Sequence, residues 1–152
     1  MIKIFTDGAA QGNPGPGGYG TILRFGKHEK ELSEGFRLTT NNRMELMAVI
    51  AGLEAIKKRG IPVTIVSDSK YVVEAVEKGW IWNWEKTNFK KKANPDLWKR
   101  FIPLYHKFHP KFEWIKGHNG HPENERCDQL AVMAAQGRTL EADEAYEKSI
   151  AQ

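Results

Sequence analysis

The 152-residue sequence lacks several features that would assign it to a specialised class of protein. Its single cysteine, Cys127, cannot form an internal disulfide, so a reducing cytoplasm is the expected compartment. No stretch approaches the ~18 apolar residues of a membrane span, and Asp7 interrupts the N-terminal apolar run too early for a signal peptide. No repeat or linker divides the chain. We therefore expect one cytoplasmic domain with no membrane partner.

The excess of positive charge is confined to one segment. The formal net charge is +4. Residues 85–100 hold six cations and two anions, so this segment alone accounts for the whole excess. A solvated surface loop is the ordinary explanation of such a run, and a contact for a polyanion is the functional one.

Hydrophobic periodicity predicts a single α/β domain. Strands are predicted over 2–7, 19–25, 30–38, 63–68 and 111–117, and helices over 41–60, 69–79, 94–108 and 121–137. We expect Asn42 to cap the first helix in a capping box with Glu45, and Gly60 to end it. The polar residues 138–152 are expected to fray. This order predicts a hairpin-rich sheet continued by strands that are reached through helices.

Four carboxylates fall near the ends of these elements. Asp7 and Asp68 each end a predicted strand, Glu45 lies in the first turn of the first long helix, and Asp128 lies in the last helix. If the two strands are parallel neighbours, their carboxylates converge at one edge of the sheet and need a cation to neutralise them. All-oxygen ligands favour Mg²⁺ or Mn²⁺ over Zn²⁺. Each residue alone also has an ordinary explanation as a turn former, cap or surface charge.

Five segments together resemble the bacterial type 1 ribonuclease H family. They are FTDGAAQGNPGPGGYG, TTNNRMEL, VSDSKYV, DLW and WIKGHNGHPENERCDQLA, and they follow in order along nearly the whole chain. The resemblance implies the ribonuclease H-like fold, a five-stranded mixed sheet flanked by helices, over residues 1–137. It also implies hydrolysis of the RNA strand of an RNA·DNA hybrid to 3′-hydroxyl and 5′-phosphate ends.

The resemblance also implies cofactors and roles for particular residues. Asp7, Glu45, Asp68 and Asp128 would bind two Mg²⁺ ions, with Mn²⁺ as a substitute, and His118 would assist proton movement or product release. The implied substrate contacts are Gly8, Asn13, Thr40, Asn41, Asn42, Lys70, Trp80, Trp84, Lys90, Lys91 and Lys92. A monomer is expected. Whether a partner such as a single-strand-binding protein recruits the enzyme is left open.

The glycine-rich segment after Asp7 fits neither phosphate-binding motif. It contains two prolines and leads into a strand, whereas a dinucleotide fingerprint leads into a helix and a Walker loop needs G-K-[ST]. The resemblance implies instead that its bare backbone approaches the minor groove of the hybrid and binds 2′-hydroxyls. Lys70 stands where the family has a glutamine, which can change a base-edge contact into a phosphate contact.

Three other interpretations are open from the sequence. One is a DNA-cleaving nuclease of the same superfamily, which the glycine-rich segment and TTNNRMEL argue against. A second is a hybrid-binding module without catalysis, which the complete carboxylate set argues against. A third is a zinc site, for which the candidate ligands are His118, His121, Cys127, His106 and His109. Cys127 falls within NERCD and is more typical of a small buried residue.

Overall fold

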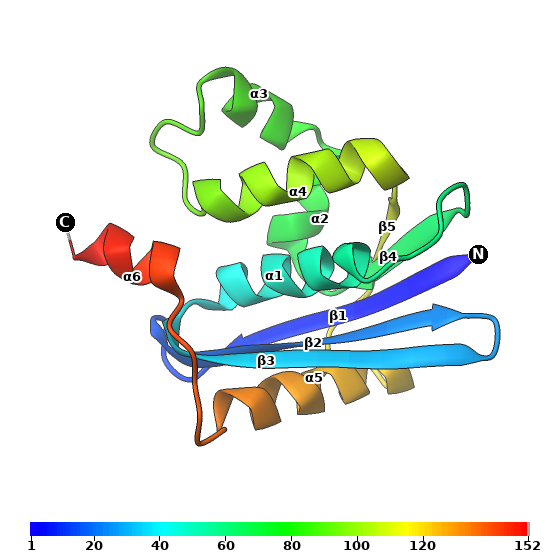
Figure 1. The fold of residues 1–152 in the computed structure, drawn as a ribbon, viewed down its shortest axis with the longest axis horizontal. Helices are drawn as coiled ribbons and strands as arrows, with labels where there is room; N and C mark the ends of the chain where they lie inside the picture. Colours follow the sequence, from blue (N-terminus) through cyan, green and yellow to red (C-terminus); the bar gives the residue numbers. More distant parts are fainter. Residues whose placement is uncertain (152) are drawn as a thin grey trace.

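The computed structural model describes residues 1–151, which form a five-stranded mixed sheet with the strand order β3-β2-β1-β4-β5 (Figure 1). The predicted fold class is therefore confirmed. The strands are β1 (Ile2–Ala10), β2 (Gly15–Phe25), β3 (His28–Thr39), β4 (Val63–Ser67) and β5 (Lys111–Trp114).

Helices cover both faces of this sheet. They are α1 (Asn41–Glu54), α2 (Lys70–Glu77), α3 (Trp80–Lys86), α4 (Pro95–Phe108), α5 (Pro122–Ala135) and α6 (Glu144–Ile150). The helices α1 to α4 lie on one face, α5 lies on the other, and α6 lies beside the start of α1 (Figure 1). The main core fills the space between the sheet and the first group of helices, where Trp98 and Phe101 are fully buried.

Within residues 1–151, none of the helices combines the length and apolar character that a membrane crossing requires.

The strand pairing brings two of the predicted carboxylates to one edge of the sheet. β1 pairs in parallel with β4, with Phe5 opposite Val66. Asp7 and Asp68 each lie two residues further along, so they emerge side by side as predicted. On the other side of β1, β2 and β3 form the expected antiparallel hairpin, with the predicted turn at Gly26 between the paired residues Phe25 and His28.

The glycines of β2 have a packing role that the sequence did not reveal. β2 begins at Gly15, four residues before the predicted start, and two of its glycines, Gly18 and Gly20, face α5. A Cβ atom at Gly20 would lie 2.2 Å from the backbone oxygen of Cys127, and one at Gly18 would lie 2.6 Å from that of Ala131. Such distances are too short for any side chain. These glycines therefore let α5 pack directly on the sheet.

Both predicted ends of α1 differ from the structure. The cap is Thr40 rather than Asn42, because the Thr40 hydroxyl accepts a hydrogen bond of 3.2 Å from the backbone N–H of Arg43. The helix ends at Glu54, not at Gly60, and Ala55 occupies its C-cap. The lysines after it are exposed and belong to the connection to β4. The helix α3 was not predicted; it lies between the predicted helices over 69–79 and 94–108 and overlaps the basic segment only at Glu85 and Lys86.

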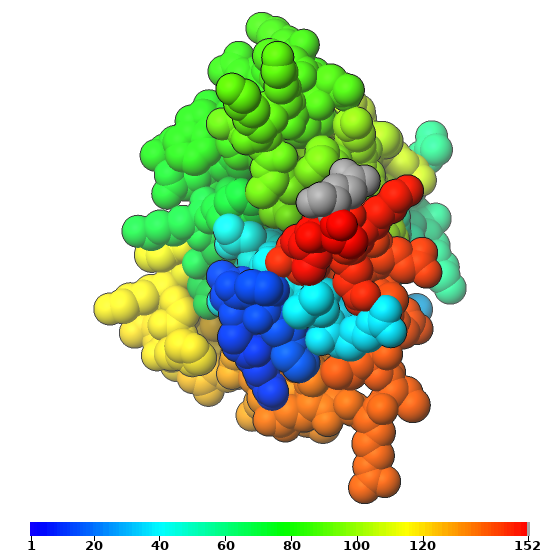
Figure 2. All heavy atoms as spheres, turned by 90° about the vertical axis from the view of Figure 1, so that its left-hand side faces the viewer, coloured from blue at the N-terminus to red at the C-terminus, as the bar shows by residue number. Residues whose placement is uncertain are grey.

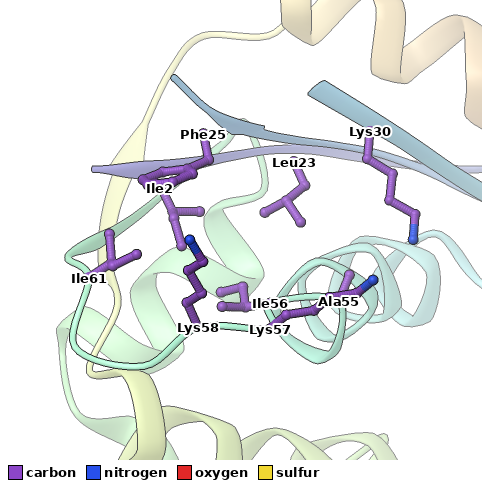
Figure 3. Close-up of a pocket in the computed structure, with 9 residues that line it drawn as sticks. All are labelled: Ile2, Leu23, Phe25, Lys30, Ala55, Ile56, Lys57, Lys58 and Ile61. Carbon is purple, nitrogen blue, oxygen red and sulfur yellow. The ribbon is translucent and has the colours of Figure 1, made fainter. Parts of the chain in front are cut away.

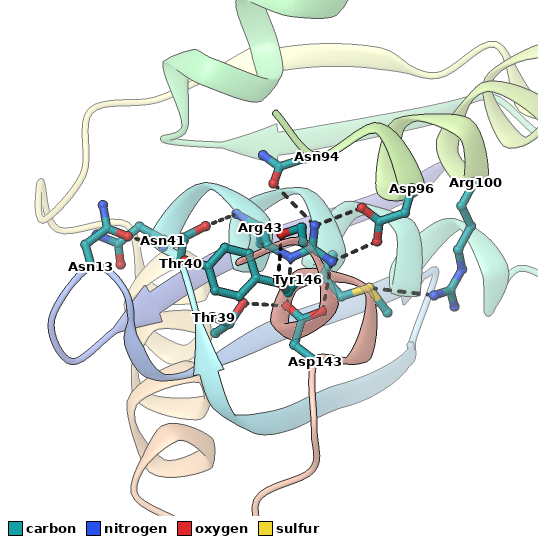
Figure 4. Close-up of polar contacts among 12 residues, drawn as sticks. Asn13, Thr39, Thr40, Asn41, Arg43, Asn94, Asp96, Arg100, Asp143 and Tyr146 are labelled. Carbon is teal, nitrogen blue, oxygen red and sulfur yellow. Dashed lines mark hydrogen bonds and ion pairs between the residues drawn. The ribbon is translucent and has the colours of Figure 1, made fainter. Parts of the chain in front are cut away.

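The C-terminal segment, which was expected to fray, forms α6 and pairs with β3 in the structure, and only Gln152 lies outside the described residues. We call residues 138–150 the C-terminal strap. Its backbone pairs with β3, where Arg37 N–H donates to Glu141 O at 2.8 Å and Glu141 N–H donates to Gly35 O at 3.2 Å. Its Asp143 carboxylate accepts hydrogen bonds of 2.7 Å from the Thr39 hydroxyl and from Arg43 Nε (Figure 4).

Arg43 joins three separate segments through this strap. Its guanidinium donates to both carboxylate oxygens of Asp143 and to both oxygens of Asp96 at the start of α4, at 2.7–2.9 Å (Figure 4). The Arg43 side chain is only 4% exposed. Hydrogen bonds from Arg43 hold the pKa of Asp96 below its usual value, although burial alone would raise it. The strap thus fixes the first turn of α1 at Arg43, two residues before Glu45.

We predict that Asp143→Ala lowers the free energy of unfolding by about 2–4 kcal/mol, because it removes a buried partner of Arg43 and of Thr39. Glu147→Ala is the matched control in the same strap. It removes only a solvent-screened pair with Arg37, which typically contributes little, so no measurable change is expected. Urea unfolding measures both variants. Equal effects of the two substitutions would show that the buried ion cluster does not anchor the strap.

Candidate active site

A pocket of about 350 Å³ opens at the carboxyl ends of β1 and β4. Its lining includes all four predicted carboxylates and the predicted histidine: Asp7, Glu45, Asp68, Asp128 and His118. Figure 2 shows this end of the molecule, where the segment joining β1 to β2 (blue) projects beside the start of α1 (cyan). The yellow loop after β5 lies on one side of it and the red C-terminal strap on the other.

Three of the carboxylates form a tight group. Asp7, Glu45 and Asp68 each offer an oxygen atom that lies within 4.8 Å of the other two. Asp128 lines the same pocket but stands outside this group. Among residues 1–151 this is the only grouping of three or more such ligands, so the zinc alternative has no support there. Cys127 is instead buried, with its Sγ 3.2 Å from the backbone oxygen of Phe5.

Gly8 explains how Glu45 comes so close to Asp7. A Cβ atom at Gly8 would lie 2.4 Å from the backbone nitrogen of Glu45 and 2.8 Å from Cβ of Met44. Only glycine therefore lets the first turn of α1 pack against the end of β1. The Gly8 N–H also donates to Asp7 Oδ1 at 2.9 Å, which orients that carboxylate.

Asp68 is held by its two serine neighbours. The Ser67 hydroxyl accepts a hydrogen bond of 3.0 Å from the backbone N–H of Ser69, and the Ser69 hydroxyl caps α2 by accepting from Val72 N–H at 3.2 Å. Both contacts shape the turn between β4 and α2. They fix the direction in which the Asp68 side chain leaves the backbone.

The loop after β5 brings His118 to the same place. A Cβ atom at Gly117 would lie 2.6 Å from Asp68 Oδ2, so the backbone passes directly against that carboxylate. His118 follows with a φ of 55°, a left-handed conformation that is uncommon outside glycine. The histidine charge lowers the pKa of Asp68, although burial has the larger effect and raises it.

The pocket is electrostatically unfavourable without a cation. Burial, together with the charges of Asp68 and Asp128, raises the pKa of Asp7 to about 8. The pKa of Glu45 is raised as well, first by burial and then by the charge of Asp7. Three converging carboxylates therefore cannot all ionise readily at neutral pH.

The donor set of this pocket fits a hard divalent cation. All the ligand atoms offered by the tight group are carboxylate oxygens, which suit Mg²⁺ or Mn²⁺. Glu45 Oε2 is buried and has no hydrogen-bond partner within the described part of the chain. A buried acceptor without a partner is costly unless a cation satisfies it. These observations fit the predicted metal ligands.

The predicted groove residues surround the pocket, and two of them also connect its walls. Asn41 Oδ1 accepts from Ala10 N–H at 2.6 Å, and Asn13 Oδ1 accepts from Asn41 N–H at 3.2 Å (Figure 4). Each amide thus uses its oxygen for structure, which leaves its NH₂ group as the donor for a ligand. Asn42, which does not cap α1, is exposed and lines the pocket.

The predicted substrate contacts within residues 79–98, which we call the handle, lie apart from the pocket. Lys90, Lys91 and Lys92 are exposed in the loop after α3 and do not line it. Trp80 is 41% exposed at the start of α3. Trp84 is half-buried and packs edge-on against Trp98, with 5.9 Å between ring centroids. Trp84 is therefore partly a core residue.

Two aromatic residues near the site were missed from the sequence. Tyr71 lines the pocket, and its hydroxyl accepts hydrogen bonds from Asn94 and Trp98. Trp114 ends β5, and its indole N–H donates to the backbone oxygen of Asp68 at 3.0 Å. The WIKGH motif contains Trp114, but only the strand pairing reveals its contact with Asp68.

A second pocket lies at the opposite end of the sheet (Figure 3). It is lined by Ile2, Leu23, Phe25, Ala55, Ile56 and Ile61 together with Lys30, Lys57 and Lys58. The lining of this second pocket contains no carboxylate.

A five-stranded mixed sheet with this pocket defines an α/β protein that carries a cluster of carboxylates suited to a hard cation. The RNase H family model matches residues 1–136, and the chain belongs to this family. The chain is 52% identical over 151 residues to Ribonuclease H of Rippkaea orientalis, covering 96% of this chain and 92% of the relative.

Solved structures agree with this assignment. A type 1 RNase H with the type 2 active-site motif superposes with a TM-score of 0.79 at 28% identity, covering 99% of this chain and 81% of the other. An RNase H crystallised in complex with an RNA/DNA hybrid superposes with a TM-score of 0.67 at 27% identity, covering 90% of this chain and 97% of the other.

We predict that the stability of the metal-free protein falls as the pH rises from about 4 to about 8. The pKa of Asp7 is about 8 in the folded protein, against about 3.9 when unfolded. The folded state therefore binds more protons across this window, and stability is lost as they leave. Asp7→Asn should flatten the decline and raise the free energy of unfolding at pH 8 by about 1–3 kcal/mol.

Urea unfolding in EDTA at several pH values measures this effect. Glu113→Gln, at an exposed acid on β5, is the matched control and should keep the wild-type pH dependence. A decline of the same steepness in Asp7→Asn would contradict the role of Asp7.

Proposed function

We propose that the chain is an endonuclease that hydrolyses the RNA strand of RNA·DNA hybrids and leaves 3′-hydroxyl and 5′-phosphate ends. The single observation that carries this proposal is the convergence of Asp7, Glu45 and Asp68, within 4.8 Å, in a chain of the RNase H family. The related RNase H that was crystallised with an RNA/DNA hybrid supports the choice of substrate.

In this proposal Asp7, Glu45, Asp68 and Asp128 hold two Mg²⁺ ions, with Mn²⁺ as a substitute. When bound, such ions activate water and stabilise the charge that develops on the entering and leaving oxygens of a phosphodiester. The chain places the four carboxylates around one pocket, where Gly8 and the serines beside Asp68 fix their directions. Burial makes the charged carboxylates less stable, so neutralisation of their charge by a cation is favoured.

His118 moves protons at the edge of this pocket. Its loop is held against Asp68 at Gly117, so its imidazole lies near the attacked phosphate without being a metal ligand. An imidazole nitrogen can accept a proton and a protonated imidazole can donate one, which is the chemistry of a general acid–base group. It therefore suits transfer to the leaving oxygen or release of the product.

In this proposal the protein contacts both the RNA strand and the DNA strand of the hybrid. Gly8, Asn13, Asn41 and Asn42 line or flank the pocket and contact the minor groove, where the 2′-hydroxyl distinguishes RNA from DNA. Thr40 and Lys70 bind phosphates. The exposed lysines Lys90, Lys91 and Lys92, with Trp80 and Trp84, contact the DNA backbone, which gives affinity without base-sequence preference.

The domain that carries this activity spans residues 1–137, with the C-terminal strap as a support outside it. We infer that the enzyme acts as a monomer in the cytoplasm. A single buried thiol is compatible with that compartment.

We predict metal-dependent cutting of one substrate among four labelled duplexes: RNA·DNA, RNA·RNA, DNA·DNA, and DNA with one embedded ribonucleotide. In Mg²⁺ only the RNA strand of the hybrid should be cut, and EDTA should abolish the reaction. Asp7→Asn should reduce the rate by at least ~10³-fold while the hybrid still binds. Cutting of DNA would indicate a DNA nuclease of the same superfamily, and binding without cutting would indicate a binding module.

We predict that replacing Lys90, Lys91 and Lys92 together by Ala raises KM about three- to tenfold and leaves kcat nearly unchanged. Each lost phosphate contact should lower the slope of log KM against log salt concentration by about 0.9. The matched control replaces Lys30, Lys57 and Lys58, which lie around the distant pocket of Figure 3. An unchanged salt slope in the handle variant would remove these lysines from the substrate interface.

A further inference from the structure

One indole group contacts both residues that flank Ser69. Trp114 Nε1–H donates to the backbone oxygen of Asp68 at 3.0 Å. The same ring lies beneath the Lys70 ammonium, with 5.2 Å from Nζ to the ring centroid. Asp68 and Lys70 both line the acidic pocket, whereas Trp114 belongs to β5 and is 44% exposed. The strand β5, although distant in sequence, therefore contacts the residues at which α2 begins.

The position of Lys70 needs an explanation, because this cation lines the same pocket as the carboxylates and, in the described part of the chain, forms an ion pair with none of them. Within residues 1–151 no ion pair involves Lys70. A lysine ammonium on a flexible four-carbon stem is free to swing onto a neighbouring carboxylate such as Asp68. It would then neutralise a charge that the cation site requires, and it would compete directly with the metal ion.

The indole face provides a competing position for this ammonium. A cation–π contact at an exposed site changes an equilibrium by about two- to fivefold. An exposed ion pair changes one by no more than about fivefold. The two interactions are of similar strength, so the ring is able to keep the ammonium away from the carboxylates.

We propose that Trp114 is a positioning residue of the acidic site. Its N–H fixes the backbone at Asp68, and its ring holds the Lys70 ammonium beside the carboxylates rather than on them. Held there, the ammonium is available to a phosphate oxygen of the substrate. This last step rests on the proposed function, whereas the effect on metal binding does not.

A double-mutant cycle read out by Mg²⁺ binding without substrate tests this positioning. Trp114→Phe keeps an aromatic face but loses the N–H donor, and Trp114→Leu loses both. Calorimetry should show Mg²⁺ binding about two- to fivefold weaker to Trp114→Leu than to Trp114→Phe. In chains that also carry Lys70→Gln, the two Trp114 variants should bind Mg²⁺ equally. The same ratio in both backgrounds would mean that Trp114 only supports packing, and would overturn the proposal.

The phosphate step is tested separately, in chains that also carry Asp7→Asn, by hybrid binding at several salt concentrations in EDTA. Adding Lys70→Gln should lower the salt slope by about 0.7–0.9, the value for one lost phosphate contact. An unchanged slope would refute the phosphate contact. If the protein fails to cut any hybrid but the Mg²⁺ cycle gives the expected ratios, the proposed function fails and the positioning role of Trp114 stands.

Discussion

The mutual repulsion of Asp7, Glu45 and Asp68 is the constraint on which the rest of the structure depends. Their oxygens approach within 4.8 Å of one another. Two unit charges about 4 Å apart, at an effective dielectric constant near 20, repel by about 4 kcal/mol. That is a large share of the about 5–15 kcal/mol by which a domain is stable. Burial of the charges and then their repulsion raise the pKa values of Asp7 and Glu45, so the metal-free protein relieves both costs by retaining protons. A divalent cation would relieve the repulsion between the carboxylates without protonation, so the site is suited to a cation.

The fold holds these charges together by close backbone approach and by remote anchoring. Gly8 lets α1 contact β1, and Gly117 lets the histidine loop contact Asp68. The first turn of α1 is then fixed from its other side by Arg43, which the C-terminal strap and α4 bind through carboxylates. The buried ion cluster and the acidic site thus lie at the two sides of the same helical turn. Movement of that turn would shift Glu45 and the groove asparagines together.

The sequence was sufficient where local pattern determines structure. Strand alternation located the five strands, and the strand-end positions of Asp7 and Asp68 predicted the convergence that the parallel pairing of β1 and β4 confirms. Prediction from the sequence failed where contacts between residues distant in sequence determine the structure. The strap is ordered because Asp143 meets Arg43, 100 residues away, which no local pattern reveals. The glycine-rich segment that includes the start of β2 was attributed to substrate contact, whereas Gly18 and Gly20 instead let α5 approach the sheet. Thr40 and Asn42 are both good caps, and only the observed start of α1 separates them.

Counting the protons released when Mg²⁺ binds tests the central claim most directly. Calorimetric titrations at pH 7, in buffers with different ionisation enthalpies, give this number. Metal ligands must be deprotonated, so a site that holds protons at neutral pH must release them on binding. The raised pKa values of Asp7 and Glu45 predict release of about one proton at pH 7, and progressively less as the pH rises above about 8. Binding of Mg²⁺ at this site with no proton release at pH 7 would show that the carboxylates are already ionised. It would contradict the view that their repulsion governs the structure.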